Sequence, residues 1–107
     1  MARKEPIEVR PQRELDRFND PIGPVPDWRT VPGATVVPRS SQDYEQRGQI
    51  IIGGFMIALN APVKDSEGEA VVLQATDEFR VRGEVYQVEG QIGDYGRKII
   101  FYIERPN

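Results

Sequence analysis

The chain has 107 residues with neither cysteine nor histidine, and its formal net charge is −3. It is therefore expected to form one small domain without a disulfide framework or a thiolate metal site, and it lacks the imidazole that serves most often as general base and zinc ligand. The acidic balance argues against sequence-independent binding of nucleic acid, which depends on lysine and arginine neutralising phosphates. No apolar run approaches the roughly 20 residues that span a bilayer, so neither a signal peptide nor a membrane helix is expected, and synthesis in the cytoplasm follows.

Residues 1–32 are expected to form an extended, proline-rich arm. Seven of the nine prolines lie in the first 38 residues, and this density breaks helices and strands and favours polyproline-like conformation. The candidate anchors of the arm are Phe18, Ile22 and Trp28, because a lone tryptophan in a polar segment is typical of a side chain that docks on another subunit. The alternative is a disordered and dispensable leader.

Residues 33–107 are expected to form an all-β domain of about six short strands. The first strand covers the β-branched residues 34–37. Residues 49–59 are the most apolar stretch and form a long strand bent at two adjacent glycines, which would cost a helix about 2 kcal/mol relative to alanine. Short strands follow at residues 71–73 and 98–104. With turn signals about every 8 to 12 residues, the pattern predicts a small antiparallel β-barrel.

The clearest element is a hairpin over residues 79–90, in which apolar and charged side chains alternate. Its core and turn positions are Phe79, Val81, Gly83, Tyr86, Val88 and Gly90. With Gly83 and Glu84 as the two turn residues, Val81 would pair with Tyr86 and Phe79 with Val88, while Arg80 and Arg82 point to the other face. Such a unit builds a sheet and contains no reactive group.

The strands at residues 49–59 and 98–104 are apolar on both faces, which a lone barrel with a wet exterior does not need. In the last strand, Ile100 and Tyr102 lie on the face opposite to the core residues. Exposed apolar patches on small proteins commonly mark interfaces. Ile100 and Tyr102 are therefore candidate contacts between subunits, unless the arm covers that face.

No catalytic, cofactor or metal site is predicted. The carboxylates Asp65, Glu67 and Glu69 alternate in a loop over residues 60–70, but a calcium loop also needs a glycine at its sixth position, a final bidentate glutamate and flanking helices. The glycines match no phosphate-binding fingerprint and belong to turns. Arg80 and Arg82 are too few to make a phosphate track for single-stranded nucleic acid.

Two segments together resemble the head-closure, or head-to-tail stopper, proteins of tailed bacteriophages, and most closely those of siphophages infecting actinobacteria. The first segment is residues 33–41, GATVVPRSS. The second is the hairpin pattern Asp77-x-Phe79-x-Val81-x-Gly83-x-x-Tyr86-x-Val88-x-Gly90. The resemblance covers residues 33–96 and leaves out the proline-rich arm.

The resemblance implies a structural virion protein of the phage neck, not an enzyme. Members of this family form a hexameric ring beneath the portal and adaptor, close the DNA-filled head and dock the tail. Its partners would be other copies of the chain, the portal and adaptor assembly, and the tail terminator or tail tube, with viral DNA in the channel bound without sequence specificity and no membrane involved. In this family a loop projects into the channel, and residues 60–70 would supply it. From the acidity of that loop we add the hypothesis that Asp65, Glu67 and Glu69 repel DNA phosphates.

Two other readings of the same features remain open. A tail terminator or tail-completion protein would share a ring-forming β architecture but join the end of the tail tube first. A small β-barrel module could instead bind a peptide or an oligonucleotide as a monomer.

Overall fold

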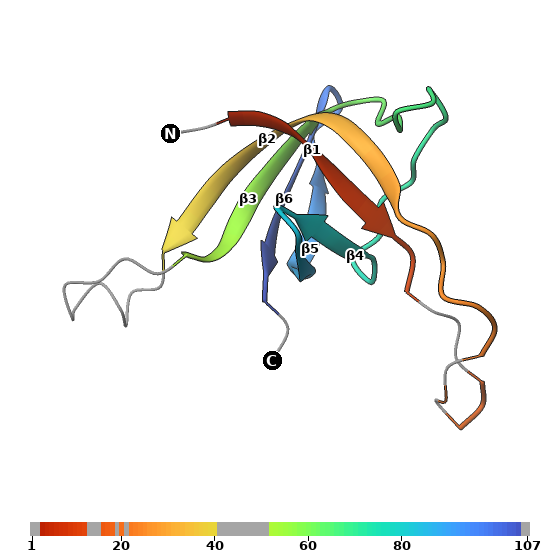
Figure 1. Ribbon diagram of the computed structural model, residues 1–107. Helices are drawn as coiled ribbons and strands as arrows, with labels where there is room; N and C mark the ends of the chain where they lie inside the picture. Colours follow the sequence, from red (N-terminus) through yellow and green to blue (C-terminus); the bar gives the residue numbers. More distant parts are fainter. Residues whose placement is uncertain (1–2, 13–15, 19, 21, 41–51, 106–107) are drawn as a thin grey trace.

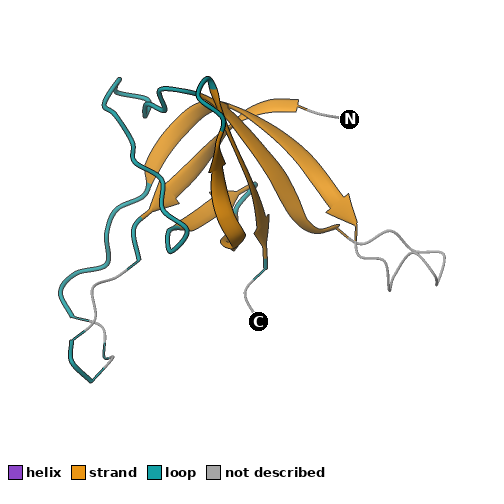
Figure 2. Ribbon diagram, turned by 180° about the vertical axis from the view of Figure 1, so that it is seen from behind, coloured by secondary structure: helices purple, strands orange, loops and turns teal. Residues whose placement is uncertain are grey.

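A computed structural model describes residues 3–12, 16–18, 20, 22–40 and 52–105 (Figure 1). Its six strands are β1 Arg3–Arg10, β2 Arg29–Ser40, β3 Ile52–Asn60, β4 Glu78–Val81, β5 Glu84–Asp94 and β6 Lys98–Glu104. They form a closed barrel in the order β1-β2-β3-β6-β5-β4, and every neighbouring pair is antiparallel. The described residues contain strands and loops but no helix (Figure 2). The predicted small all-β barrel is confirmed.

The N-terminal part of the chain differs from the prediction. Residues 3–10 form β1, which pairs with β2 on one side and closes the barrel against β4 on the other. Since β2 begins at Arg29, the predicted arm over residues 1–32, and with it the boundary at residue 33, is wrong for residues 3–10 and 29–32. Pro6 is tolerated because the β1–β2 register shifts there, between Glu5 and Ile7, and a bulge accommodates a residue without an amide hydrogen.

The predicted strand at residues 71–73 is also wrong, because these residues lie in the loop between β3 and β4. Val71 is buried and its amide donates to the carbonyl oxygen of Val63 at 2.9 Å, whereas Val72 is 79% exposed. The β-branched residues have a strand-like composition, but here they find no partner strand. Composition alone does not show whether a neighbouring strand is available.

Strands β3 and β6 confirm the two apolar strands expected from the sequence, although residues 49–51 lie outside the described residues. The two strands are neighbours and pair from Gly54 opposite Glu104 to Asn60 opposite Lys98. At Gly54 an added Cβ would lie 2.0 Å from the carbonyl oxygen of Ile103, so the close approach of the two backbones requires glycine there.

Strands β4 and β5 form the predicted hairpin, but the turn comes one residue earlier. Phe79 pairs with Tyr86 and Val81 with Glu84, so the expected pairs Val81–Tyr86 and Phe79–Val88 are wrong. The turn residues are Arg82 and Gly83, with φ of 53° and 84°. A type I′ turn needs positive φ at both central residues and matches the twist of the strands, and Arg82 adopts that conformation. The pairing moves by two residues, so each side chain keeps its expected face.

The barrel interior is filled by one apolar cluster, to which every strand contributes. Its buried members are Ile7, Val9, Val31, Ala34, Val36, Phe55, Ile57, Leu59, Val63, Val71, Phe79, Val81, Tyr86, Phe101 and Ile103. The rings of Phe79 and Phe101 lie 4.9 Å apart between centroids, and those of Phe55 and Tyr86 lie edge to face at 5.4 Å. Such pairs add to the stabilisation that burial provides. Because side chains fill the interior, the exposed parts of the described chain are the outer surface of the barrel and the connections between strands.

Candidate functional site

Three ion pairs join β1 to β4 and to the turn that follows β4, at the place where the barrel closes. They join Arg10 to Glu78, Arg80 to Glu8 and Arg82 to Glu5. The distances from arginine Nε to glutamate Oε1 are 3.2, 2.8 and 3.0 Å respectively. Arg80 lies directly opposite Glu8 and lowers the pKa of that carboxyl below its ordinary value. Since only three residue pairs join β1 to β4, these side chains reinforce a short backbone ladder.

Trp28 covers two of these ion pairs. Its ring centroid lies 4.2 Å from the guanidinium carbon of Arg10 and 4.7 Å from that of Arg80. Both contacts have cation–π geometry. The side chain predicted as an anchor for another subunit is therefore half-buried against its own barrel, and it fixes the end of the segment that joins β1 to β2.

The other two predicted anchors in that segment are exposed. Phe18 is 69% and Ile22 40% exposed, and Val25, which the sequence reading did not single out, is 53% exposed. Figure 1 shows the segment projecting from the barrel and returning to it. The described part of the segment therefore presents several apolar side chains to solvent within a few residues of each other.

Ile100 and Tyr102 lie on the outer face of β6, as their alternation with buried Phe101 and Ile103 predicts. Ile100 is half-buried. Tyr102 is 43% exposed, and the guanidinium carbon of Arg39 lies 4.6 Å from its ring centroid. Within the chain, Arg39 thus covers part of the ring that was proposed as a contact between subunits.

The three loop carboxylates are not equivalent. Asp65 Oδ2 accepts hydrogen bonds from Arg29 Nη2 at 2.8 Å and Nε at 3.2 Å, and its Oδ1 accepts from the amides of Glu67 and Glu69 at 2.9 Å each. These bonds, that to Arg29 foremost, lower the pKa of Asp65 below its ordinary value. Asp65 therefore organises the loop from within, whereas the side chains of Glu67 and Glu69 are exposed.

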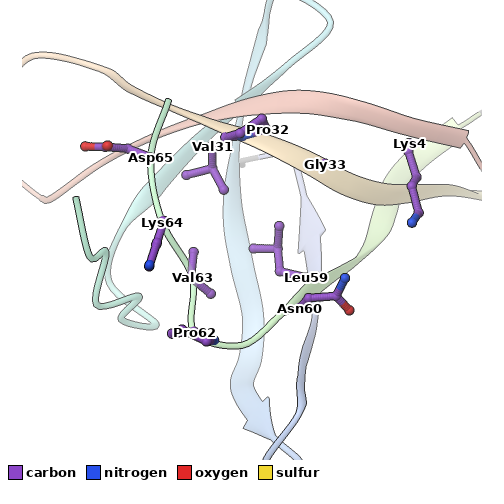
Figure 3. A pocket seen from close by; sticks show the side chains of 10 residues that line it. All are labelled: Lys4, Val31, Pro32, Gly33, Leu59, Asn60, Pro62, Val63, Lys64 and Asp65. Atoms are coloured by element: carbon purple, nitrogen blue, oxygen red, sulfur yellow. The ribbon is translucent and has the colours of Figure 1, made fainter. Parts of the chain in front are cut away.

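The described surface also contains an open cleft at the end of the barrel where β3 ends. It has a volume of about 310 Å³ and lies between β2 and residues 60–65. In Figure 3 its floor is apolar, with Val31, Leu59 and Val63 pointing into it, and Lys4 and Lys64 stand on opposite sides. A smaller hollow of about 50 Å³ adjoins it, shares Lys4, and reaches Lys98.

Neither the charged ladder between β1 and β4 nor this cleft was found by sequence reasoning. For the ladder a signal exists, since Ile7, Glu8, Val9 and Arg10 alternate in the way a half-buried strand requires, but the flanking prolines concealed it. For the cleft there is no local signal, because Lys4, Lys64 and Lys98 are far apart in the sequence and only the closure of the barrel places them around one hollow.

Among the described residues, no group of three histidine, cysteine, aspartate or glutamate side chains is placed to hold a metal ion. The same part of the chain forms no helix long and apolar enough to cross a membrane. Comparison of the chain with family models, with curated proteins and with solved structures finds no match.

Proposed function

We propose that this protein is a structural subunit of the neck of a tailed bacteriophage, a head-to-tail stopper. Copies of the chain would form a hexameric ring beneath the portal and adaptor, close the DNA-filled head and receive the tail. In this role the protein catalyses no reaction and works through its surfaces, in the virion.

The observation that carries the proposal is the hairpin pattern from Asp77 to Gly90. Its residues have distinct roles in the barrel. Phe79, Val81 and Tyr86 are buried in the core, and Gly83 and Gly90 have φ of 84° and 79°. Gly90 lies at the register shift between β5 and β6. The pattern that resembles the stopper family is thus the one this hairpin needs to close a small barrel.

Asp77 begins the pattern and has a structural role at the entrance to β4. Its side chain is buried, its Oδ2 accepts a hydrogen bond from the Gln74 amide at 2.9 Å, and its own amide donates to the Gln74 carbonyl oxygen at 3.0 Å. Burial raises the pKa of this carboxyl above its ordinary value. The residue closes the turn that delivers the chain into the hairpin.

The barrel suits a ring subunit for a mechanical reason. A closed sheet has no free edge on which another strand could add, so copies must join through side chains and connections. The apolar side chains of the β1–β2 segment and the outer face of β6 offer such contacts. These features support assembly into a ring, in addition to the support from the resemblance. They do not point to a chemical reaction.

In this proposal the loop at residues 60–70 faces the channel, and its charges left unpaired among the described residues are the carboxylates of Glu67 and Glu69 and the ammonium group of Lys64, so negative charge predominates. Asp65 is compensated by Arg29, as described above. Carboxylates facing the channel repel DNA phosphates, so the genome would be held by steric closure without adhering during ejection.

Disruption of the gene in its phage, followed by negative-stain electron microscopy of the lysate, tests the proposal. A stopper predicts emptied heads beside finished but unattached tails, and complementation with the wild-type gene should restore virions. Filled, stable heads beside tails of abnormal length or end structure would instead identify a tail terminator or tail-completion protein. Normal virions would refute both.

A further inference from the structure

The three lysines of the chain line the cleft and the smaller hollow that adjoins it. Lys4, Lys64 and Lys98 are the only lysines in the sequence. Lys4 and Lys64 line the cleft of about 310 Å³, and Lys4 and Lys98 line the hollow beside it. The two hollows share Gly33, Leu59 and Asn60 in addition to Lys4, so they form one continuous depression.

None of these lysines is neutralised within the described residues. The six ion pairs found there all use arginine. The one carboxylate that lines the depression, Asp65, is held by Arg29 at 2.8 Å. Lys4 and Lys64 therefore give the lining of the cleft an uncompensated positive charge, while Glu67 and Glu69 are exposed farther along the same loop, and a concave surface charged in this way attracts anionic groups.

The floor of the cleft requires more than an anion. Val31, Leu59 and Val63 lie between the flanking lysines (Figure 3), and because they belong to the barrel core only their outermost atoms form the apolar floor that a ligand can contact. A ligand that fits carries carboxylates at its ends and aliphatic side chains between them. An extended acidic peptide has this chemistry, whereas a small inorganic anion would leave the apolar floor unused.

The chain itself carries such a peptide in the β1–β2 segment. Ile22 and Val25 are 40% and 53% exposed there, and they lie between Asp20 and Asp27, whose carboxylates make no ion pair with any described residue. Pro24 and Pro26 favour an extended conformation and reduce the entropy lost on binding. The segment thus matches the cleft in both charge and apolarity.

A chain cannot readily place this segment in its own cleft. Trp28, packed on Arg10 and Arg80, holds the end of the segment at the seam between β1 and β4. From there the segment runs away from the barrel, downward in Figure 1, while the cleft lies at the upper end where β3 finishes. The donor is therefore a second copy.

We propose that the lysine cleft of one copy binds the segment around Asp20–Asp27 of the next copy. The cleft and the segment are different surfaces, so the contact is head to tail, and repetition generates a ring if the rotation closes. The inference rests on the proposed ring, to which it assigns an interface.

A synthetic peptide of residues 16–28 tests the contact on the full chain in solution. Titrated into the ¹⁵N-labelled protein, it should shift the amide resonances of Lys4, Lys64, Lys98 and Asn60. Replacing the three exposed lysines by glutamate should weaken peptide binding at least about tenfold, as should Asp20→Asn with Asp27→Asn in the peptide. Glutamine at the lysine positions serves as the second variant if the glutamates disturb the fold.

Absent shifts, shifts confined to another face, or equal binding by the lysine variants would overturn the contact. Tighter binding of a single-stranded oligonucleotide at the same lysines would also overturn it and assign the cleft to nucleic acid. The peptide titration and the gene disruption test the two proposals separately. Peptide binding at the lysines with normal virions refutes only the proposed function, and a stopper phenotype without peptide binding refutes only this contact.

Discussion

The stability of the Ile7→Ala variant shows whether residues 3–10 form a strand of the barrel or part of a dispensable arm. Ile7 is 1% exposed and lies in the core cluster. The substitution removes three buried carbon groups, worth about 2.4 kcal/mol at about 0.8 kcal/mol each. The cavity left behind destabilises the fold further, so the free energy of unfolding should fall by about 3 to 4 kcal/mol in total. Against a total stability of about 5 to 15 kcal/mol for a domain, this loss is large.

The assay is equilibrium unfolding in urea, followed by far-ultraviolet circular dichroism and by the fluorescence of Trp28, the only tryptophan. Ile7→Val removes less of the side chain and should lower the free energy of unfolding by about 1 kcal/mol. The two variants together show whether the loss of stability grows with the volume removed. The matched control is Val72→Ala, because Val72 is 79% exposed and its truncation should be within about 0.5 kcal/mol of neutral. Equal, small losses for Ile7→Ala and Val72→Ala would refute the placement of β1 in the barrel.

Three further predictions concern single side chains. Gly54→Ala should destabilise the protein by about 3 kcal/mol or more, because the new Cβ would meet a backbone carbonyl oxygen at 2.0 Å, whereas Gly53→Ala meets open space and should be nearly neutral in the same urea assay. Trp28→Ala should cost about 1 kcal/mol through the lost stacking on two guanidinium groups, and an unchanged urea midpoint would contradict that packing. The pKa of Asp65 is lowered in the fold, so its stabilising contribution is present above the ordinary value of 3.8 and lost as pH falls through the lower, folded-state pKa. Thermal melts should therefore decline more steeply in acid for the wild type than for Asp65→Asn, and parallel declines would contradict this assignment.

Local patterns in the sequence determined the fold class and much of the core. Alternation in residues 98–104 correctly divided β6 into buried and outer faces, and the apolar run with paired glycines correctly indicated a strand. These elements could be predicted because side chains alternate with period two along any strand. The hairpin was found for the same reason, although its turn was placed one residue late.

Which segments of the chain form strands of the barrel was decided only by the tertiary structure. Residues 3–10 contain Pro6 and are followed by Pro11, and both prolines argue against a strand, but the segment becomes one because β2 and β4 both offer a free edge. Residues 71–73 have a strand-like composition and remain a loop because no such edge is available to them. Strand formation depends on a partner that lies far away in the sequence, and local propensity does not contain that information.

The candidate binding surfaces were likewise only partly predictable from the sequence. The sequence identified Phe18 and Ile22 as candidate anchors for another subunit, and within the chain both side chains are exposed. It could not show that Trp28 packs on Arg10 and Arg80, or that Arg29 compensates Asp65. Nor could it show that Lys4, Lys64 and Lys98 line two adjoining hollows. Each of these groupings joins residues separated along the chain, and closure of the barrel is the physical event that brings them together.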